Sequence, residues 1–425
     1  MKSELTHGGA VGCSGRNVRS DLRVVAESRT SGGIEVELVS CVESCYGQAI
    51  RTQAREVLYE LGVRHAHILI EDGGALPFVI AARLEAAIRG AGLSCERRVL
   101  PKRLDLPAPA LKDRVRRTRL YVPGNEPRYF VNAALYRPDG VILDLEDSVH
   151  PLEKESARIL VRNGLRTVDF GKSERMVRIN KLPVGLEDLN EIIPQAPDLI
   201  MLPKIEDARQ VTVIDQHIKK IAQCERVDRP IWIMPILESA MGIENALSIA
   251  TASDLICALT IGLEDYISDI GVTKTPGGQE TLFARMRMLN AAKAAGLQAI
   301  DSVYADVGDL EGLARWGEQS CSLGFDGMGC VHPSQISVVE RAYTPSRVEL
   351  EKALRIVSAF DEAQSEGLAV VSVDSKMVDA PVVNRARKLI ESARMLGHLS
   401  AASVNVRISD NGSSSDDFRD RKANQ

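Results

Sequence analysis

Charged side chains follow most of the apolar runs in the middle of this chain, and these are the residues whose types and spacing could do chemistry. The residues that we single out are Asp144, Glu146, Asp147, Arg178, Lys204, Glu238, Asp265 and His332. Carboxylates with few cysteines or histidines nearby favour a hard divalent cation, and Mg²⁺ binds one or two carboxylates together with waters and substrate oxygens. We expect Glu238 and Asp265 to be the magnesium ligands, although each acid could equally be salt-bridged within the fold.

The basic residues of this group also have alternative roles. Arg178 could hold a substrate carboxylate in a two-pronged grip, or it could pair with Glu146 or Asp147. Lys204 could form a Schiff base with a carbonyl substrate, although a lysine among acids is more often an ion pair or a phosphate contact. His332 could bind a nucleotide, or it could cap a helix before Pro333.

Eight apolar, strand-like runs precede these residues, and helical patterns such as 241–252 and 281–295 separate most of them. The runs are 120–122, 141–145, 176–179, 199–202, 231–237, 256–261, 299–304 and 327–331. This rhythm predicts an α/β fold, a TIM (β/α)8 barrel over residues 117–345, with a doubly wound sheet as the alternative. The carboxyl ends of barrel strands carry function, so the charged residues should converge on one mouth.

Composition excludes several classes of protein. The net charge of −5 argues against a nucleic-acid binder, and an aromatic content of 4% gives bases no stacking platform. No apolar run reaches the roughly 20 residues that span a bilayer, and we expect no signal peptide. The eight cysteines form no CxxC pair, which argues against a zinc ribbon and favours reduced thiols in a cytoplasmic protein.

A chain of 425 residues should hold more than one domain. Residues 1–98 predict a small α+β domain, with strands at 20–25 and 34–39 forming a hairpin, a strand at 66–70, and helices at 46–61 and 76–88. The proline-containing residues 99–116 predict an extended linker with a reach of about 60 Å at about 3.3 Å per residue, so that a tethered domain could visit a distant site. Residues 346–398 predict a C-terminal helical segment, and residues 399–425 a disordered tail.

Residues 117–385 resemble the beta subunit of citrate lyase, in the citrate lyase/malyl-CoA lyase family. The matching segments, in chain order, are 117–124, 142–149, 178–180, 202–204, 237–240, 262–266, 332–335 and 376–381. The order of the segments is specific, although each alone is weak. Leu237 stands where the family usually has isoleucine, a change that keeps size and polarity.

The resemblance implies cleavage of a citryl thioester into an acetyl thioester and oxaloacetate, with Mg²⁺ lowering the energy of the alkoxide. It implies that Asp379, on a segment covering a neighbouring subunit's mouth, is the acid/base; the alternative is that Asp379 caps a helix next to Pro381. A homo-oligomer, which we expect to be a trimer, follows from that arrangement. Substrate and its nucleotide-like arm are expected to be bound by Arg178, Arg117, Lys154, Asp144, Glu146, Asp147, Lys204 and His332.

Residues 1–90 are similar to the citrate lyase gamma subunit, an acyl carrier protein, through the segments 46–51 and 71–86. That family carries phosphoribosyl-dephospho-CoA on a serine near its N-terminus. Ser20 is our first choice for the attachment point and Ser14 the second; both could instead be ordinary polar residues. A fused carrier would raise the effective concentration of acyl groups at the barrel mouth. A separate alpha-type transferase subunit is then an expected partner.

Three alternatives remain at this point. The chain could be a malyl-CoA or citramalyl-CoA lyase that acts on free CoA thioesters, with a vestigial carrier domain. It could be a non-catalytic carrier scaffold, against which the intact pair Glu238 and Asp265 weighs. It could also be a Schiff-base aldolase that uses Lys204.

Overall fold

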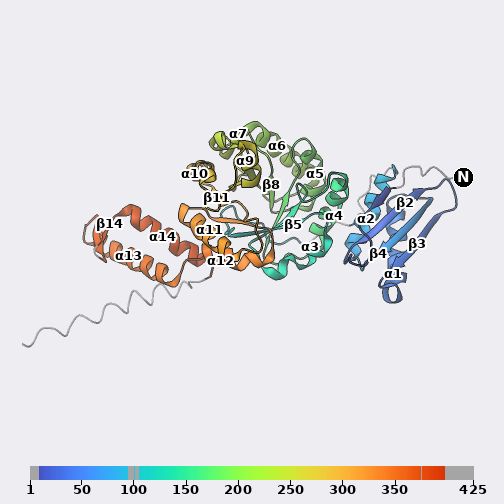
Figure 1. The fold of residues 1–425 in the computed structure, drawn as a ribbon, viewed down its shortest axis with the longest axis horizontal. Helices are drawn as coiled ribbons and strands as arrows, with labels where there is room; N and C mark the ends of the chain where they lie inside the picture. Colours follow the sequence, from blue (N-terminus) through green and yellow to red (C-terminus); the bar gives the residue numbers. More distant parts are fainter. Residues whose placement is uncertain (1–8, 94–99, 101–104, 375, 398–425) are drawn as a thin grey trace, which may run out of the picture. The chain divides into compact units, whose positions relative to one another are not determined.

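The computed structural model describes residues 9–93, 100, 105–374 and 376–397. The chain divides into two compact units, residues 1–339 and residues 340–425. Within the first unit, a small N-terminal domain precedes a barrel (Figure 1).

Eight parallel strands close into the barrel, because the last strand pairs with the first. They are β5 (Thr118–Pro123), β6 (Gly140–Asp144), β7 (Glu174–Arg178), β8 (Leu199–Leu202), β9 (Trp232–Leu237), β10 (Ala258–Ile261), β11 (Gln298–Asp301) and β12 (Gly327–Cys330). Each overlaps one of the eight predicted runs. The TIM barrel is therefore confirmed and the doubly wound sheet is wrong.

Helices follow the strands around the barrel. They are α3 (Pro127–Ala133), α4 (Lys154–Thr167), α5 (Val184–Ile192), α6 (Ala208–Glu225), α7 (Ala240–Glu244), α8 (Ala246–Ala250), α9 (Leu263–Ile270), α10 (Gln279–Ala294), α11 (Leu310–Leu323) and α12 (Ile336–Tyr343). The short 3-10 helices are η1 (Ala134–Tyr136), η2 (Pro151–Glu153), η3 (Ile193–Gln195) and η4 (Pro333–Gln335). The single helix predicted over 241–252 is two helices, α7 and α8, which meet at Asn245.

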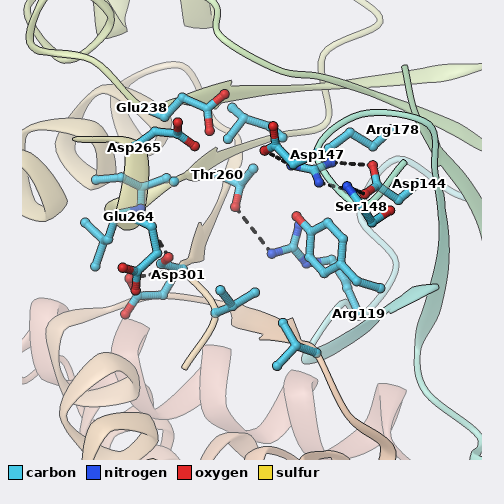
Figure 2. A pocket seen from close by; sticks show the side chains of 18 of the residues that line it. Arg119, Asp144, Asp147, Ser148, Arg178, Glu238, Thr260, Glu264, Asp265 and Asp301 are labelled. Atoms are coloured by element: carbon cyan, nitrogen blue, oxygen red, sulfur yellow. Dashed lines mark hydrogen bonds and ion pairs between the residues drawn. The ribbon is translucent and has the colours of Figure 1, made fainter. Parts of the chain in front are cut away.

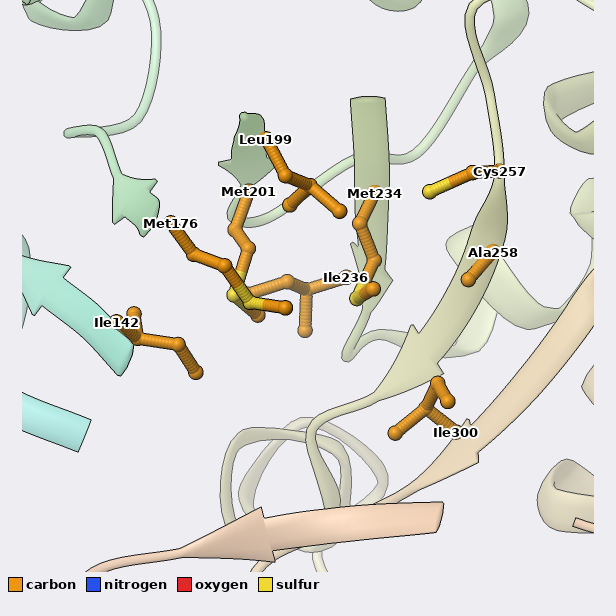
Figure 3. Close-up of a cluster of buried hydrophobic side chains, with 9 residues drawn as sticks. All are labelled: Ile142, Met176, Leu199, Met201, Met234, Ile236, Cys257, Ala258 and Ile300. Carbon is orange, nitrogen blue, oxygen red and sulfur yellow. The ribbon is translucent and has the colours of Figure 1, made fainter. Parts of the chain in front are cut away.

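Apolar side chains from successive strands fill the barrel interior (Figure 3). The cluster consists of Ile142, Met176, Leu199, Met201, Met234, Ile236, Cys257, Ala258 and Ile300. Barrel strands are covered on both faces, which explains why they appear in the sequence as continuous apolar runs rather than as alternating ones. This packed core leaves the carboxyl ends of the strands for chemistry.

The N-terminal domain is a four-stranded sheet in the order β1-β2-β4-β3 with two helices. Its elements are β1 (Gly9–Val11), β2 (Leu22–Ser28), β3 (Ile34–Ser40), α1 (Glu43–Glu60), β4 (Ala66–Asp72) and α2 (Pro77–Gly90). The predicted hairpin is wrong. β4 lies between β2 and β3, antiparallel to the first and parallel to the second, so these strands have no shared edge.

Residues 107–116, in the predicted linker, are bound to the barrel. The Arg229 guanidinium donates to the carbonyls of Pro107 and Ala108, and Nε1 of Trp232 donates to the Ala110 carbonyl at 2.7 Å. Arg116 is fully buried and forms a two-pronged ion pair with Glu174. This stretch is therefore attached to the barrel rather than free to act as a tether.

The second unit contains α13 (Arg347–Ser365), the paired strands β13 (Val371–Val373) and β14 (Lys376–Val378), and α14 (Ala380–Met395). The two helices pack through Ala353, Ala386 and Ile390. The tail predicted at 399–425 lies outside the described residues. Among the helices that the structure describes, none is long and apolar enough to cross a membrane.

Candidate active site

A cavity of about 430 Å³ opens at the carboxyl ends of the barrel strands. Its lining comes from β5, β6, β7, β9, β10 and β11 and from the loops that follow them. Figure 2 shows Glu238 and Asp265 beside one another on one side, and Asp144 and Arg178 on the other. Five predicted residues line it directly: Asp144, Asp147, Arg178, Glu238 and Asp265.

Arg178 is held by the acids that follow β6. Its Nε and Nη2 donate to the two oxygens of Asp144 at 2.6 and 2.7 Å, and Nη1 lies 3.0 Å from Glu146. Its guanidinium also lies 5.2 Å from the ring centre of Tyr121. Burial alone would raise the pKa of Asp144, but the bonds from Arg178 outweigh it and hold that pKa below its ordinary value. Arg178 is thus paired with acids of the fold, which is the alternative that the sequence left open. These ion pairs fix Arg178 at the cavity wall.

Lys204 brings a positive charge among three carboxylates. Its Nζ lies 3.3 Å from Asp265, 3.3 Å from Glu146 and 3.7 Å from Asp147. Burial lowers the pKa of Lys204, but the surrounding carboxylates raise it above its ordinary value. The amine therefore stays protonated at neutral pH, which disfavours Schiff-base chemistry because that chemistry requires a neutral amine.

Glu238 is a buried acid of the cavity, with 5% of its surface exposed. Its Oε1 accepts a hydrogen bond of 2.6 Å from the Lys204 backbone amide. A Cβ at Gly262 would lie 2.4 Å from Oε2 of Glu238, so the glycine makes room for this carboxylate. Burial, and then the charge of Asp265, raise the pKa of Glu238 to about 8.

Excess negative charge also affects Glu146. Burial and the hydrogen bond with Asp147 raise the pKa of Glu146 to about 7, in spite of the nearby Arg178 and Lys204. Glu238 in the cavity and Glu146 beside it thus both have raised pKa values, because burial disfavours their charged forms and neighbouring carboxylates add to that effect. This is the electrostatic condition under which an added cation is stabilised.

The donor set fits Mg²⁺ better than a closed metal cage. No group of three or more His, Cys, Asp or Glu side chains arranged around a metal position occurs among the described residues. Glu238 and Asp265 offer two carboxylates, and about half of the Asp265 side chain is open to the cavity. Mg²⁺ takes one or two carboxylates and completes its octahedron with waters and substrate oxygens, so these two residues would hold it.

Other predicted residues lie elsewhere in the first unit. Arg117 pairs with Asp139 at the start of β5, the end of the strand opposite the cavity, so its position gives no support to a grip on the nucleotide-like arm. Nζ of Lys154 donates to the carbonyls of Leu145 and Glu146 and fixes that loop. His332 is exposed and caps η4 through the Ser334 amide.

The remaining predicted residues lie outside the barrel. Asp379, in the second unit, caps α14 by accepting from the Val382 amide at 3.4 Å, which is the capping role that the sequence also allowed. Ser14 and Ser20 both lie in the loop between β1 and β2. Ser14 is exposed, whereas Ser20 is half-buried and adopts a left-handed conformation with φ of 59°.

Sequence reasoning missed Arg119, Tyr121 and Thr260, which also line the cavity. Arg119 is buried inside the barrel, and its Nη2 donates to Oγ1 of Thr260 at 3.3 Å. Arg119 and Tyr121 alternate along β5, which places both on its inner face. A cation within an otherwise apolar strand was the signal that could have identified Arg119.

The arrangement suits cleavage or formation of a carbon–carbon bond next to oxygen-rich substrates. Two carboxylates can hold a divalent cation, which polarises a hydroxyl or carbonyl oxygen. Arg178 and Arg119 provide positive charge on the other walls, where substrate carboxylates can be bound, and the Lys204 ammonium lies 3.3 Å from Asp265.

Comparison with known proteins gives an independent view of the barrel. The model of the HpcH/HpaI aldolase/citrate lyase family matches residues 117–333. Citrate lyase subunit beta of Leuconostoc mesenteroides is 39% identical over 286 residues, which cover 66% of this chain and 94% of the relative. The mitochondrial citramalyl-CoA lyase of Rattus norvegicus is 33% identical, over 65% of this chain and 86% of the relative.

A solved structure also resembles this chain. It is CitE of Mycobacterium tuberculosis in complex with magnesium, acetoacetate and coenzyme A, which is 32% identical with a TM-score of 0.55, over 67% of this chain and 100% of that one. A second family model, that of the malonate decarboxylase delta subunit (MdcD), an acyl carrier protein, matches residues 11–91. An acyl-carrier domain and a barrel of this kind are thus joined in one chain.

Proposed function

Because this chain belongs to the HpcH/HpaI aldolase/citrate lyase family, we propose that it is a magnesium-dependent lyase that cleaves a citryl thioester into an acetyl thioester and oxaloacetate. The acyl group would be carried on the N-terminal domain of the same chain. The observation that carries the proposal is the pair Glu238 and Asp265 at the mouth of a barrel fused to an acyl-carrier domain.

The chain's own residues divide the work of the reaction. When bound by Glu238 and Asp265, Mg²⁺ would supply the positive charge that stabilises the substrate's C3 oxygen as it loses its proton. Arg178, locked against Asp144, would orient the carboxylate that leaves with oxaloacetate. Lys204 would remain a fixed ammonium that sets the charge of the cavity.

The carbon–carbon bond breaks with its electron pair going to the acetyl thioester, as an enolate. Donors or positive charge near the thioester carbonyl stabilise that enolate. One proton leaves the C3 hydroxyl and one must reach the enolate carbon, and we assign this acid/base work to Asp379 of a neighbouring copy in a homotrimer, which would accept the first proton and donate the second. An oligomer would therefore be required for activity.

The carrier half of the proposal concerns the attachment serine. Ser20 remains the first choice for phosphoribosyl-dephospho-CoA and Ser14 the second, since both lie in the β1–β2 loop of the carrier-type domain. An alpha-type transferase subunit would recharge the carrier. Asp144, Glu146, Asp147, Lys154 and His332 are the residues that we expect around the substrate and its arm.

A second candidate is a lyase for free CoA thioesters such as citramalyl-CoA. The similarity to the rat citramalyl-CoA lyase favours it, since that relative is nearly as similar as the citrate lyase subunits. Under this alternative the N-terminal domain would carry no acyl group.

The deciding experiment is the intact mass of the chain purified from its own host, followed by peptide mapping. A nucleotide-thiol adduct on the Ser20 or Ser14 peptide supports the carrier-bound substrate. An unmodified chain that turns over citramalyl-CoA or malyl-CoA contradicts it. Loss of citryl thioester cleavage in both Glu238→Ala and Asp265→Ala is expected, and full activity in both would remove the metal site from the proposal.

A further inference from the structure

The N-terminal domain and the barrel share an interface between α2 and α4. In Figure 1 these helices lie beside one another. Every residue from Phe78 to Ile88 in α2 is buried. A helix that is buried on all sides needs partners on all sides, and α2 packs on β1, β2 and α1 within its own domain and on α4 of the barrel. The burial of α2 is therefore explained by two sets of partners.

Buried ion pairs cross this interface. Both guanidinium nitrogens Nη1 and Nη2 of Arg162, in α4, donate to the carboxylate of Glu85, in α2, at 2.9 and 2.5 Å. Both side chains are fully buried. Arg89 and Glu191 extend the network at its edge. Exposed ion pairs stabilise a contact between domains only slightly. The Arg162–Glu85 pair is instead fully buried and makes two hydrogen bonds, which indicates a stable contact rather than a transient collision.

Arg83 joins the β1–β2 loop of the carrier domain to the barrel. Its Nε and Nη2 donate to the two oxygens of Asp21, the residue after Ser20, at 2.9 and 2.8 Å. Its Nη1 donates to Oγ of Ser156 at the start of α4, and its Nη2 to the Asn125 carbonyl at 2.8 Å. One buried guanidinium thus binds both domains.

The barrel side of this contact lies at the mouth. Asn125 is two residues beyond the end of β5, whose last residue, Pro123, lines the cavity. The Gly124 amide between them donates to the Asp144 carbonyl at 2.7 Å. The loop that Arg83 grips is therefore adjacent to the strand end at which Asp144 holds Arg178.

We infer that the carrier-type domain is docked on the barrel of its own chain, and that Arg83 is the positioning residue that holds the loop with Ser14 and Ser20 at the rim of the mouth. The acyl group would then reach the mouth by movement of the prosthetic group alone, while the carrier-type domain stays docked. The docking stands on the contacts alone, whereas the delivery step rests on the proposed function. Holding the attachment point near the mouth raises the effective concentration of the acyl group there.

The first test measures docking in the full chain. We would compare Arg83→Met and Arg162→Met with the control Arg23→Met, which removes a partly exposed ion pair with Glu71 inside the carrier domain. Arg162→Met changes only the barrel side and leaves Glu85 paired with Arg89, so the carrier domain keeps its own contacts. Hydrogen exchange in α2 and α4 should become about tenfold faster in both interface variants and stay unchanged in the control. Equal exchange in all three variants would overturn the docking.

The second test measures delivery. In chains loaded with an acyl group, both interface variants should cleave the carrier-borne citryl group about tenfold more slowly, while turnover of free citryl-CoA stays within about twofold of the parent chain. Equal losses on both substrates, or none on either, would contradict a positioning role. If the parent chain carries no prosthetic group, the proposed function fails instead, and the exchange experiment still decides the docking.

Discussion

The backbone amide of Lys204 donates a hydrogen bond of 2.6 Å to Oε1 of Glu238, and Lys204 makes this bond in a left-handed conformation with φ of 54°. That conformation is uncommon for a residue with a side chain, and such strain costs about 1–3 kcal/mol. Lys204 thereby orients one carboxylate with its backbone while its ammonium lies between three others. The proposed metal ligand is positioned by the neighbouring strand end before any cation arrives.

Replacing Glu238 with glutamine tests the proposed ligand with little change of shape. The amide oxygen can still accept from Lys204, so the fold should persist, but a charged Mg²⁺ ligand is lost. We expect kcat/KM to fall by at least about 100-fold, since even neighbours of a metal ligand are often worth 10–100-fold. Magnesium titrations followed by calorimetry should show a matching loss of affinity. Normal magnesium affinity in the variant would exclude Glu238 as a ligand.

Gly262→Ala tests the space that the Glu238 carboxylate occupies. The new Cβ would lie 2.4 Å from Oε2 and must displace it. We expect magnesium affinity to fall by about 10–100-fold, although no ligand is removed. The matched control is Gly277→Ala, where the nearest side-chain atom is 3.9 Å away and φ is not positive. Equal affinities in the two variants would show that the position of Oε2 is irrelevant to the metal.

Borohydride trapping tests the protonation state of Lys204. Because the surrounding carboxylates raise its pKa, the amine should not condense with oxaloacetate at neutral pH. Treatment with borohydride and substrate should leave the mass of the chain unchanged, while EDTA should abolish turnover. A reduced adduct on the Lys204 peptide, with activity retained in EDTA, would instead identify a Schiff-base aldolase.

The barrel was predictable because each of its strands is buried on both faces and therefore appears as a short apolar run. The N-terminal sheet was less so. Residues 22–28 and 34–40 have the alternation and the Gly32-Gly33 turn of a hairpin, yet β4 inserts between them. Alternation shows which face of a strand is buried but does not show its neighbour. The pairing of β2 and β3 with β4 (residues 66–72) joins segments that are far apart in the sequence.

The acids of the cavity were predictable because they follow strands, whereas the ion-pair partners of the charged residues were not predictable. Arg117, just before β5, and Arg119, within it, are two residues apart, but the first pairs with Asp139 and the second lies inside the barrel. Both lie toward the amino end of the strand, so the rule that function gathers at the carboxyl end could not separate them. The contacts of Arg83 with Ser156 and Asn125 join distant segments and leave no local pattern in the sequence.

Thiol reactivity should distinguish the two buried cysteines of the barrel from the exposed cysteines of the chain. Burial raises the pKa of Cys257 to about 12, and Cys330 is also buried, whereas Cys13, Cys41 and Cys224 are exposed. Native chain treated with a thiol reagent at pH 8 should keep Cys257 and Cys330 unmodified until it is unfolded. Mass mapping of labelled peptides reads this out.

The same burial predicts a pH dependence of stability. In the unfolded chain the Cys257 thiol ionises near its ordinary pKa, while in the folded chain it stays protonated until about pH 12. Its contribution to stability is therefore complete below about pH 9 and is lost as the pH rises toward 12. Cys257→Ser should reduce this alkaline loss in urea unfolding experiments. An unchanged slope of stability against pH would contradict the assignment.

Arg116→Met tests the floor of the barrel, away from the cavity. Arg116 donates to both oxygens of Glu174, at 2.7 and 2.8 Å, and neither side chain is exposed. Removing one partner leaves a buried, uncompensated carboxylate, so we expect the free energy of unfolding to fall by about 3–5 kcal/mol. Lys293→Met, which breaks a partly exposed pair with Asp326 in the same barrel, should change it little. The double variant Arg116→Met/Glu174→Met should recover much of the loss, because no unpaired charge remains buried. Urea unfolding measures all three, and a double variant no more stable than the single one would show that packing, not charge, sets the cost.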